Sequence, residues 1–275
     1  MRRILSTSCV LIGLALVSAP ASGQTRYRPY GLADPATGEK YNVELAGGFW
    51  YTAPSLTISS ESLGILGTSI DGVADLGFTK VKVNELRLVL RPATKHKFLF
   101  GYVPIRYEAD TILRKDLVFN GILFSVGLPV QSVLSWKAIN VAYEYDFLYR
   151  DRWFAGIILG ADITDVEAKL DSPVDHEYAR ARAPIPSVGG IARVYVASNI
   201  SITGKVTGFK LPESIDKERR YALRIVDVDV YGTVNFTDHA GVQGGYRSYN
   251  MTYAIELDTG DFKMEGLYLR GVVRF

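Results

Sequence analysis

The residues of this chain with the clearest catalytic potential lie in one acidic stretch around a histidine. His176 is flanked by Asp171, Asp175 and Glu177. A carboxylate that accepts a hydrogen bond from an imidazole can orient the ring, and the oriented ring can act as a general base toward water. All three carboxylates come from the same stretch, which is equally typical of a solvated loop or of a weak divalent-cation site. A hydrolytic site centred on His176 is therefore one alternative.

The other candidate groups predict neither a catalytic residue nor a cofactor. His96 and His239 fall in or beside short predicted turns, where a solvated role is expected. Cys9 is the only cysteine and lies in a segment that we expect to be removed, so the mature chain would have no disulfide, Cys–zinc site or Cys nucleophile. Glycine pairs inside the predicted strands do not open a helix and indicate no phosphate-binding loop. We predict no catalytic residue, no metal ion and no cofactor.

The N-terminus has the pattern of a secretory signal. Arg2 and Arg3 precede an apolar run at residues 9–17, and small residues follow at 19–23. The run is shorter than the roughly 20 apolar residues that span a bilayer, which favours a cleaved signal peptide over residues 1–23. The whole chain has 31 basic and 29 acidic residues, so removing those two arginines leaves the charges balanced. This balance argues against a nucleic-acid partner.

The rest of the chain shows the period of β-strands. Residues 24–40 have no periodicity and are interpreted as an irregular lead-in. No later stretch holds 18 consecutive apolar residues, so only a closed barrel could cross a membrane. Short and long connections alternate along the chain, as in an antiparallel up-and-down barrel. Ten strands are predicted, at residues 41–52, 80–91, 96–114, 130–148, 152–170, 187–198, 200–211, 220–236, 240–256 and 261–275.

The polar face of these strands carries most of the mid-strand charge. Because an unpaired charge inside a barrel is costly, we predict a paired charge network in the lumen. Its members are Glu144, Asp146, Lys205, Asp227, Asp229, Arg247 and Arg270. Lys205 and Arg247 are the expected partners of the two strand-220–236 aspartates, and Glu265 is assigned to the same inner face. The strand at 96–114 is apolar on both faces, so its phase stays open.

The end of the chain carries a further signal. Phe275 is terminal and has apolar residues at alternate positions behind it, which resembles the insertion signal of bacterial outer-membrane barrels. With Gly-Thr-Ser-Ile-Asp at residues 67–71 and Asp-Leu-Gly-Phe at 75–78, residues 41–275 resemble the OmpA/OmpW-like group of small outer-membrane β-barrels. The resemblance implies an all-β transmembrane barrel in the bacterial outer membrane, with periplasmic termini and a periplasmic lead-in at 24–40. It implies no activity.

The same resemblance implies two kinds of partner. One is the outer-membrane lipid, including lipopolysaccharide, and the other is the barrel assembly machinery, which would read the C-terminal strand ending in Phe275. Arginine pairs well with phosphate, so a basic cluster at the outer rim could hold lipopolysaccharide. The cluster comprises Lys210, Lys217, Arg219, Arg220 and Arg224. The alternative is a solvated loop, since three acidic residues are interspersed among these cations.

Two apolar segments fall in predicted outer loops. Residues 53–79 form a long loop rich in leucine and isoleucine, and long loops are often functional lids. Asn120-Gly121 between apolar residues is a strong signal for a two-residue hairpin, with Phe119 opposite Ile122. Since free apolar patches are disfavoured at a surface, we predict that the loop packs against the hairpin at the barrel mouth. The rival interpretation is an exposed adhesive or lipid-inserting tip.

Three functions remain in view at this point. The first is a non-enzymatic outer-membrane barrel that serves as a structural or surface protein, or as a narrow and largely plugged pore. Long charged side chains inside ten strands favour plugging, because even eight-stranded barrels are filled by side chains. The second is an omptin-like rim hydrolase centred on His176. The third is a soluble periplasmic lipid carrier whose apolar face lies inside.

Overall fold

The computed structural model describes residues 36–59, 67–212, 221–255 and 258–275, all within the compact unit Asp34–Phe275. Every regular element in these ranges is a β-strand. The strands are β1 (Val43–Ser59), β2 (Ile70–Asp71), β3 (Val81–Ala93), β4 (His96–Ile112), β5 (Leu117–Phe119), β6 (Ile122–Phe124), β7 (Pro129–Arg150), β8 (Trp153–Asp171), β9 (His176–Ala197), β10 (Ile200–Lys210), β11 (Tyr221–Asn235), β12 (Ala240–Ile255) and β13 (Asp258–Arg274). The predicted signal peptide, residues 24–35 of the lead-in and the cations at 217–220 lie outside the described residues.

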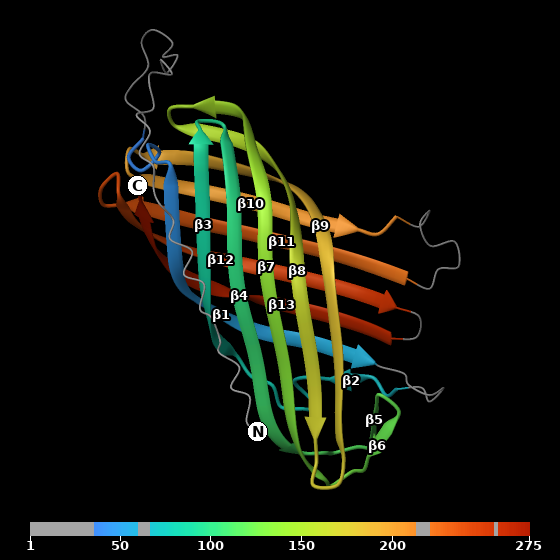
Figure 1. Ribbon diagram of the computed structural model, residues 1–275. Coiled ribbons are helices and arrows are strands. Elements are labelled where there is room, and N and C mark those ends of the chain that lie inside the picture. The colour runs from blue at the N-terminus through green and yellow to red at the C-terminus, as the bar shows by residue number, and fades with distance from the viewer. Residues whose placement is uncertain (1–35, 60–66, 213–220, 256–257) are drawn as a thin grey trace, which may run out of the picture. The chain divides into compact units, whose positions relative to one another are not determined.

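Ten long strands form one closed antiparallel wall. Each long strand pairs with the next one along the chain, and β13 pairs with β1 to close the barrel (Figure 1). The two-residue strand β2 is added to β1, and β5 pairs only with β6. The predicted all-β, up-and-down barrel of ten strands is confirmed. Among the described residues, no helix is long and apolar enough to cross a membrane.

The two ends of the barrel differ. Short turns join β3 to β4, β7 to β8, β9 to β10 and β11 to β12 at the end where the chain also terminates. Short turns beside the termini mark the periplasmic end of outer-membrane barrels, so the opposite end is the outer end. At the outer end β7 and β9 each extend to 22 residues, twice the roughly 9–11 that a tilted strand needs to cross a bilayer.

Two predicted boundaries were wrong. β9 begins at His176 instead of residue 187, so the expected loop at 171–186 is only a turn at residues 172–175. Pro184 and Pro186 lowered the strand signal there, yet the segment pairs with β8 along its whole length. Proline is compatible with a strand whose other edge is unpaired. β1 continues to Ser59, which shortens the predicted loop at 53–79.

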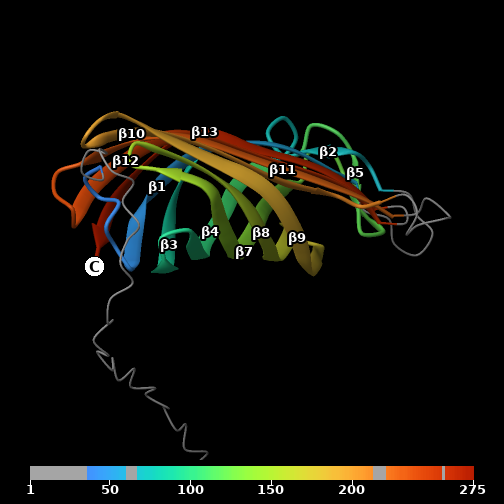
Figure 2. The same cartoon turned by 90° about the horizontal axis from the view of Figure 1, so that it is seen from above.

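The wall has two seams in its outer half. The ladder between β3 and β4 ends at Leu86 and Tyr102, although both strands continue outward. The ladder between β9 and β10 likewise ends at Val188 and Gly208, whereas β9 continues outward. Beyond these seams the wall is divided into one sheet of β4, β7, β8 and β9 and another of β10–β13, β1 and β3. Figures 1 and 2 show the strands of the two sheets crossing.

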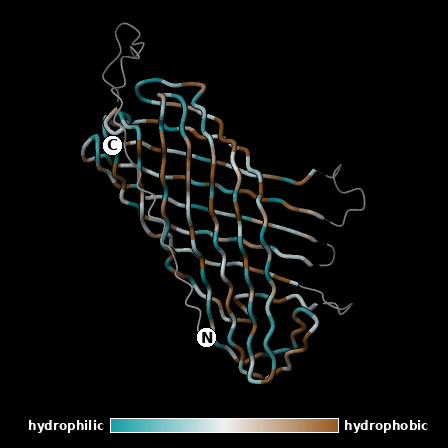
Figure 3. The backbone as a smooth tube through the Cα atoms, in the orientation of Figure 1, coloured by the Kyte–Doolittle hydropathy of each residue, from teal (hydrophilic) through white to brown (hydrophobic). Residues whose placement is uncertain are grey.

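The exterior of the barrel carries an apolar belt. Hydropathy alternates along the strands, as Figure 3 shows, because neighbouring side chains point to opposite faces of the wall. Exposed apolar side chains near the periplasmic half include Leu45, Phe49, Phe98, Phe100, Tyr102, Ile139, Val141, Ile157, Leu159, Val194, Val206, Val230, Tyr246, Leu267 and Leu269. Exposed charged residues replace them outward, namely Lys82, Arg106, Lys137, Arg182, Lys210 and Arg224. A soluble lipid carrier would have its apolar face inside the barrel and a polar face outside. The apolar belt on the outside excludes that arrangement.

An apolar core fills the outer half between the two sheets. Its central member, Trp136 of β7, has its indole ring edge-on to Tyr249, at 5.2 Å between ring centroids, and to Phe262, at 5.7 Å. Ile105 and Met264 belong to the same buried cluster. These contacts join β7 to β12 and β13 across the barrel, so the two outer sheets are held together by side-chain packing in place of backbone pairing.

The predicted hairpin and the segment before β3 complete this core. Asn120 and Gly121 have φ angles of 49° and 81°, as a two-residue turn with two left-handed residues requires, and Phe119 lies opposite Ile122. The Thr68 amide donates to the Val118 carbonyl at 2.9 Å. Leu76, Phe78, Leu117, Phe119 and Phe124 are all buried in the core. The predicted packing of the first loop against the hairpin is confirmed for residues 67–80.

Candidate functional site

The lumen near the periplasmic half contains a dense set of charged side chains. The structure places all seven residues of the predicted network on the inner face of the wall. Glu144, Asp146, Asp227, Asp229 and Arg270 are buried, whereas Lys205 and Arg247 are partly exposed to the cavity. They lie on β7, β10, β11, β12 and β13, so side chains far apart in sequence share one interior.

The two aspartates of β11 have different partners. Arg247 donates from Nε and Nη2 to the two oxygens of Asp227, both at 2.9 Å, and Lys205 lies 4.0 Å from the same carboxylate. Asp229 was expected to pair with Lys205 or Arg247, which are its neighbours in the strand register. It instead accepts a hydrogen bond from Tyr268 at 2.6 Å and lies 3.5 Å from Arg270. The register put the right groups together, but the long side chains reach diagonally along the strands.

Lys97 is the cation that the sequence analysis missed. Its ammonium lies 2.6 Å from Glu144 and 2.9 Å from Asp146. It belongs to β4, whose phase the sequence left open because both of its faces are apolar. The structure settles that phase, since Lys97, Ile105 and Tyr107 are buried inside while Phe98 and Phe100 are exposed outside. The single lysine on the inner face was the only polar signal of the correct phase in the periplasmic half of the strand.

Residues 36–42 form a strap across the periplasmic end of the lumen. The Thr37 amide donates to the Ser198 carbonyl at 2.8 Å, and the Gly38 amide donates to Asp238 at 2.9 Å. These acceptors belong to the β9–β10 and β11–β12 turns, so the strap is tied to the rim at separate points. Asn235 also donates its side-chain amide to the Thr37 carbonyl at 2.6 Å. The segment therefore closes the periplasmic end with its own backbone.

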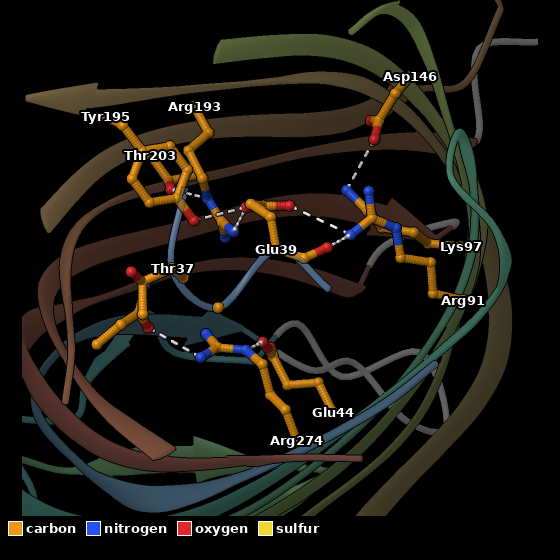
Figure 4. A network of polar contacts seen from close by, with 12 residues as sticks. Thr37, Glu39, Glu44, Arg91, Lys97, Asp146, Arg193, Tyr195, Thr203 and Arg274 are labelled. Atoms are coloured by element: carbon orange, nitrogen blue, oxygen red, sulfur yellow. Dashed lines mark hydrogen bonds and ion pairs between the residues drawn. The ribbon is translucent and has the colours of Figure 1, made fainter. Parts of the chain in front are cut away.

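Glu39 anchors the strap inside the barrel, as Figure 4 shows. Its carboxylate lies 2.8 Å from Arg193 and 3.2 Å from Arg91, and it accepts a hydrogen bond from Tyr195 at 2.7 Å. Burial alone would raise the pKa of the Glu39 carboxyl, but the guanidinium groups of Arg193 and Arg91 outweigh it and hold this pKa at about 2. Sequence analysis missed Glu39 because it lies in the lead-in, where no periodicity assigns a face.

A second cluster extends the network beneath the strap. Glu44 on β1 accepts a hydrogen bond from Arg274 at 2.7 Å and one from Arg87 at 2.8 Å. Arg274 also donates to the side-chain oxygen of Asn235 at 2.8 Å. Figure 4 shows Glu44 and Arg274 beside Thr37 of the strap. Because Glu44 accepts hydrogen bonds from two guanidinium groups, removing one of these residues leaves the charge of the cluster unbalanced.

Between this network and the outer core lies a cavity of about 120 Å³. The part of its lining that comes from β4, β7 and β8 is largely apolar, with Leu99, Val103, Ile105, Ala138, Ala142 and Ile158, but also includes the charged Lys97, Glu144 and Asp162. The other part is charged and comes from β3 and β9–β13, with Glu85, Arg87, Arg193, Asp227, Asp229 and Arg270. The cavity is comparable to an engineered one of roughly 150 Å³ that holds a benzene molecule.

His176 does not lie in a cleft. Its ring nitrogen Nδ1 is 3.2 Å from Asp171, and three quarters of its side chain is exposed at the outer end of β9. Glu177 accepts a hydrogen bond from Asn120 of the β5–β6 hairpin at 2.7 Å and so serves to fix that hairpin. Asp175 is in the turn between β8 and β9. The structure joins His176 to one of the three expected carboxylates only.

Two further expectations concern β13. Glu265 was assigned to the inner face and this was wrong: it lies outside, 2.8 Å from Lys263. Glu265 has the same parity as the exposed Leu267, so the regular alternation of the strand places it on the outer face. Phe275 has its side chain largely exposed, while its carbonyl accepts hydrogen bonds from the Asn42 and Val43 amides. The last residue thus joins the strap to the closing strand.

The fold has counterparts among solved structures. No protein-family model matches the chain, and no curated protein matches its sequence. The outer membrane protease OmpT from Escherichia coli is similar, with a TM-score of 0.57 and 10% identity over 85% of this chain and 97% of that chain. Ail, the attachment invasion locus protein of Yersinia pestis, has a TM-score of 0.36 and 7% identity over 83% of this chain and 99% of that chain. At such identities the likeness concerns the fold alone.

The molecular surface and the fold lead to one location. A closed ten-stranded barrel satisfies its backbone hydrogen bonds at membrane depth, and its apolar belt is turned outward. The charged side chains at the same depth are inside and paired. The chain is a small β-barrel protein of the bacterial outer membrane.

Proposed function

We propose that the protein is a plugged, non-catalytic outer-membrane barrel that holds a folded module at the cell surface. The observation that carries the proposal is the filling of the lumen at both ends. The strap and the Glu39 anchor close the periplasmic end, and the core around Trp136 closes the outer end. Among the described residues, a cavity of about 120 Å³ lies between the two layers. Closure at both ends supports a barrel that does not pass hydrated solutes.

The outer part of the protein, made of the outer ends of the strands and the β5–β6 hairpin, supports the same proposal. Strands β4, β7, β8 and β9 extend past the exposed charges that end the apolar belt, and the β5–β6 hairpin packs between the two sheets. Burial of Leu117, Phe119 and Phe124 is a feature of a stably folded body. A mobile gate would keep fewer apolar contacts. The extended outer end therefore suits a structural or surface role.

Conductance of the refolded full chain in planar bilayers tests the proposal. The native protein is expected to give no steady open level. A double variant, Glu39→Gln with Trp136→Ala, weakens both closures and is expected to conduct. Glu167→Gln is the matched control, because it removes a carboxylate from an ion pair outside the lumen. Steady currents through the native protein, equal to those of the double variant, would contradict a plugged barrel.

The rim hydrolase is the second candidate, and the contact between His176 and Asp171 is the observation that favours it. A survey of peptide and ester substrates with native protein and with His176→Ala distinguishes the two candidates. Hydrolysis that disappears in His176→Ala would establish the hydrolase. Because the side chain is mostly exposed, this substitution is expected to leave folding unchanged.

A further inference from the structure

The β3–β4 seam brings together features that the closed barrel does not require. From Leu90 to Leu86 the residue numbers in opposite positions of the ladder add to one constant, as Leu86 with Tyr102 and Leu88 with Phe100 show. Continued outward, that register would set Asn84 opposite Pro104 and then Lys82 opposite Arg106. Pro104 has no amide to donate, and like charges placed directly opposite destabilise a strand pair. The strands separate where these two obstacles begin.

The separation leaves one cationic residue on each strand of the seam, Lys82 on β3 and Arg106 on β4, with the Lys82 ammonium turned toward β1. Lys82 and Arg106 are both exposed on the outside of the wall, at the outer limit of the apolar belt. Lys82 lies over the ring of Phe49, with 3.5 Å from Nζ to the ring centroid. Arg106 contacts Glu108 at 3.2 Å, and both side chains are about half exposed. Such surface contacts are weak, so both cations are available to a stronger anionic partner.

Below the two cations, where the β3–β4 ladder begins, the outer face of the wall is apolar. Leu86 and Phe100 face outward, with 51% and 37% of their surface exposed. Both also line the internal cavity, together with Gly101 and Val103 of β4. Residues that face the outside of the wall at the end of the β3–β4 ladder therefore also contribute to the lining of the cavity. Behind the seam, Phe78 packs on Tyr107, at 5.9 Å between ring centroids, and forms its inner floor.

We propose that this seam binds a phosphate-bearing lipid of the outer leaflet. The phosphate lies between Lys82 and Arg106, and one acyl chain follows Leu86 and Phe100 toward the cavity. Charge complementarity selects the headgroup, because a guanidinium and an ammonium give charge-assisted hydrogen bonds to phosphate oxygens. The apolar edge directly below selects a lipid over a free anion. The proposal goes beyond the plugged barrel, since it holds whether or not the lumen conducts.

Titration of the refolded full chain with bisphosphorylated lipid A, at fixed detergent concentration, tests the site. The double variant Lys82→Ala with Arg106→Ala is expected to bind this lipid about tenfold more weakly or worse, as the loss of charge-assisted hydrogen bonds implies. The control is Lys137→Ala with Lys263→Ala, which removes the same charge from other exposed positions on the outside of the wall. Lipid A without phosphates is expected to bind the native protein as weakly as the seam variant binds the phosphorylated form.

A gain of binding guards against a trivial loss through misfolding. Glu108→Gln removes the carboxylate that competes for Arg106 and is expected to tighten binding by about threefold, in line with a surface ion pair. Inorganic phosphate is expected not to compete, because it cannot use the apolar edge. Equal losses in the seam and control variants would overturn the proposal, as would equal binding of phosphate-free lipid A. Full competition by inorganic phosphate would replace the lipid by a free anion and overturn it too.

Discussion

Replacing Glu39 by glutamine removes the only negative charge of the strap while keeping the size of the side chain. In the docked strap this carboxylate lies between the buried guanidinium groups of Arg91 and Arg193. The glutamine side chain has one oxygen that accepts and one NH2 group that donates. The guanidinium that faces the NH2 group therefore loses its hydrogen-bond acceptor. We therefore expect the strap to leave the lumen much more often in Glu39→Gln than in the native protein.

The size of this effect follows from the shifted pKa of Glu39. That pKa falls from an ordinary 4.5 to about 2 when the strap is docked, because the two arginines outweigh the effect of burial. A shift of about 2.5 units corresponds to roughly 3 kcal/mol in favour of docking by the ionised form. Glutamine has the charge of the protonated form, so the ratio of docked to released strap is expected to fall by about two orders of magnitude.

Trypsin cleavage after Lys40 measures the released population. Lys40 is exposed, but its neighbours on the strap are buried, so cleavage requires the strap to leave the lumen. When release is fast compared with cleavage, the rate follows the released population. The barrel fragment that begins at Tyr41 identifies the cut by mass. Cleavage at equal rates in the native protein and in Glu39→Gln would refute the reasoning, and Glu167→Gln should behave like the native protein.

Three other outcomes are expected. Docking lowers the pKa of Glu39, so the contribution of this residue to the stability of the docked strap is complete above pH 4.5 and is lost as the pH falls toward 2. Amide exchange of residues 37–39, corrected for intrinsic rates, should therefore become faster as the pH falls across that range. In the chain with Cys9 absent, the pair Leu88→Cys and Phe100→Cys should form a disulfide, whereas Asn84→Cys and Pro104→Cys should not, because only the first pair is within the ladder; efficient closure of the second would disprove an open seam. Deletion of Phe275 should lower the amount of assembled barrel in the outer membrane, and normal levels in heat-modifiability gels would count against an assembly role.

The strand pattern predicted the wall because membrane and lumen impose opposite polarities on alternate residues. β11 shows this clearly, since the buried Asp227 and Asp229 alternate with valines that are partly or fully exposed. The same rule failed to place β4, because its inner face is apolar wherever it meets the core around Trp136. It also missed the strand character of residues 176–186, since the prolines there are typical of loops unless one edge is known to be free. Edge status is a property of the neighbouring strand and is absent from the local sequence.

The charged residues of the lumen were likewise predictable only in part. Charges within regular strands could be assigned to the lumen, because the side of a strand residue follows from its position. Their partners could not, since Arg247 reaches Asp227 and leaves its opposite neighbour Asp229 to Tyr268. Glu39 was beyond prediction, because an irregular segment has no periodicity and its position depends on where the β9–β10 and β11–β12 turns offer acceptors. Sequence thus indicates a charged lumen, while the closure by the strap comes only from tertiary contacts.

Prolines at both seams protect the strand edges that the open ladders leave unpaired. An unpaired strand edge is a template for pairing with another chain, and long exposed edges promote aggregation. On β4 the last residue paired with β3 is Tyr102, and Pro104 follows two positions later. On β9 the last residue paired with β10 is Val188, and Pro186 precedes it by two positions. Proline offers no amide, so a foreign strand cannot continue the ladder there. Arg106 and Arg182 add charge beside these prolines. The two outer sheets can therefore separate enough to enclose an apolar core, and at the β3–β4 seam to admit a lipid, without presenting an edge that another strand can extend.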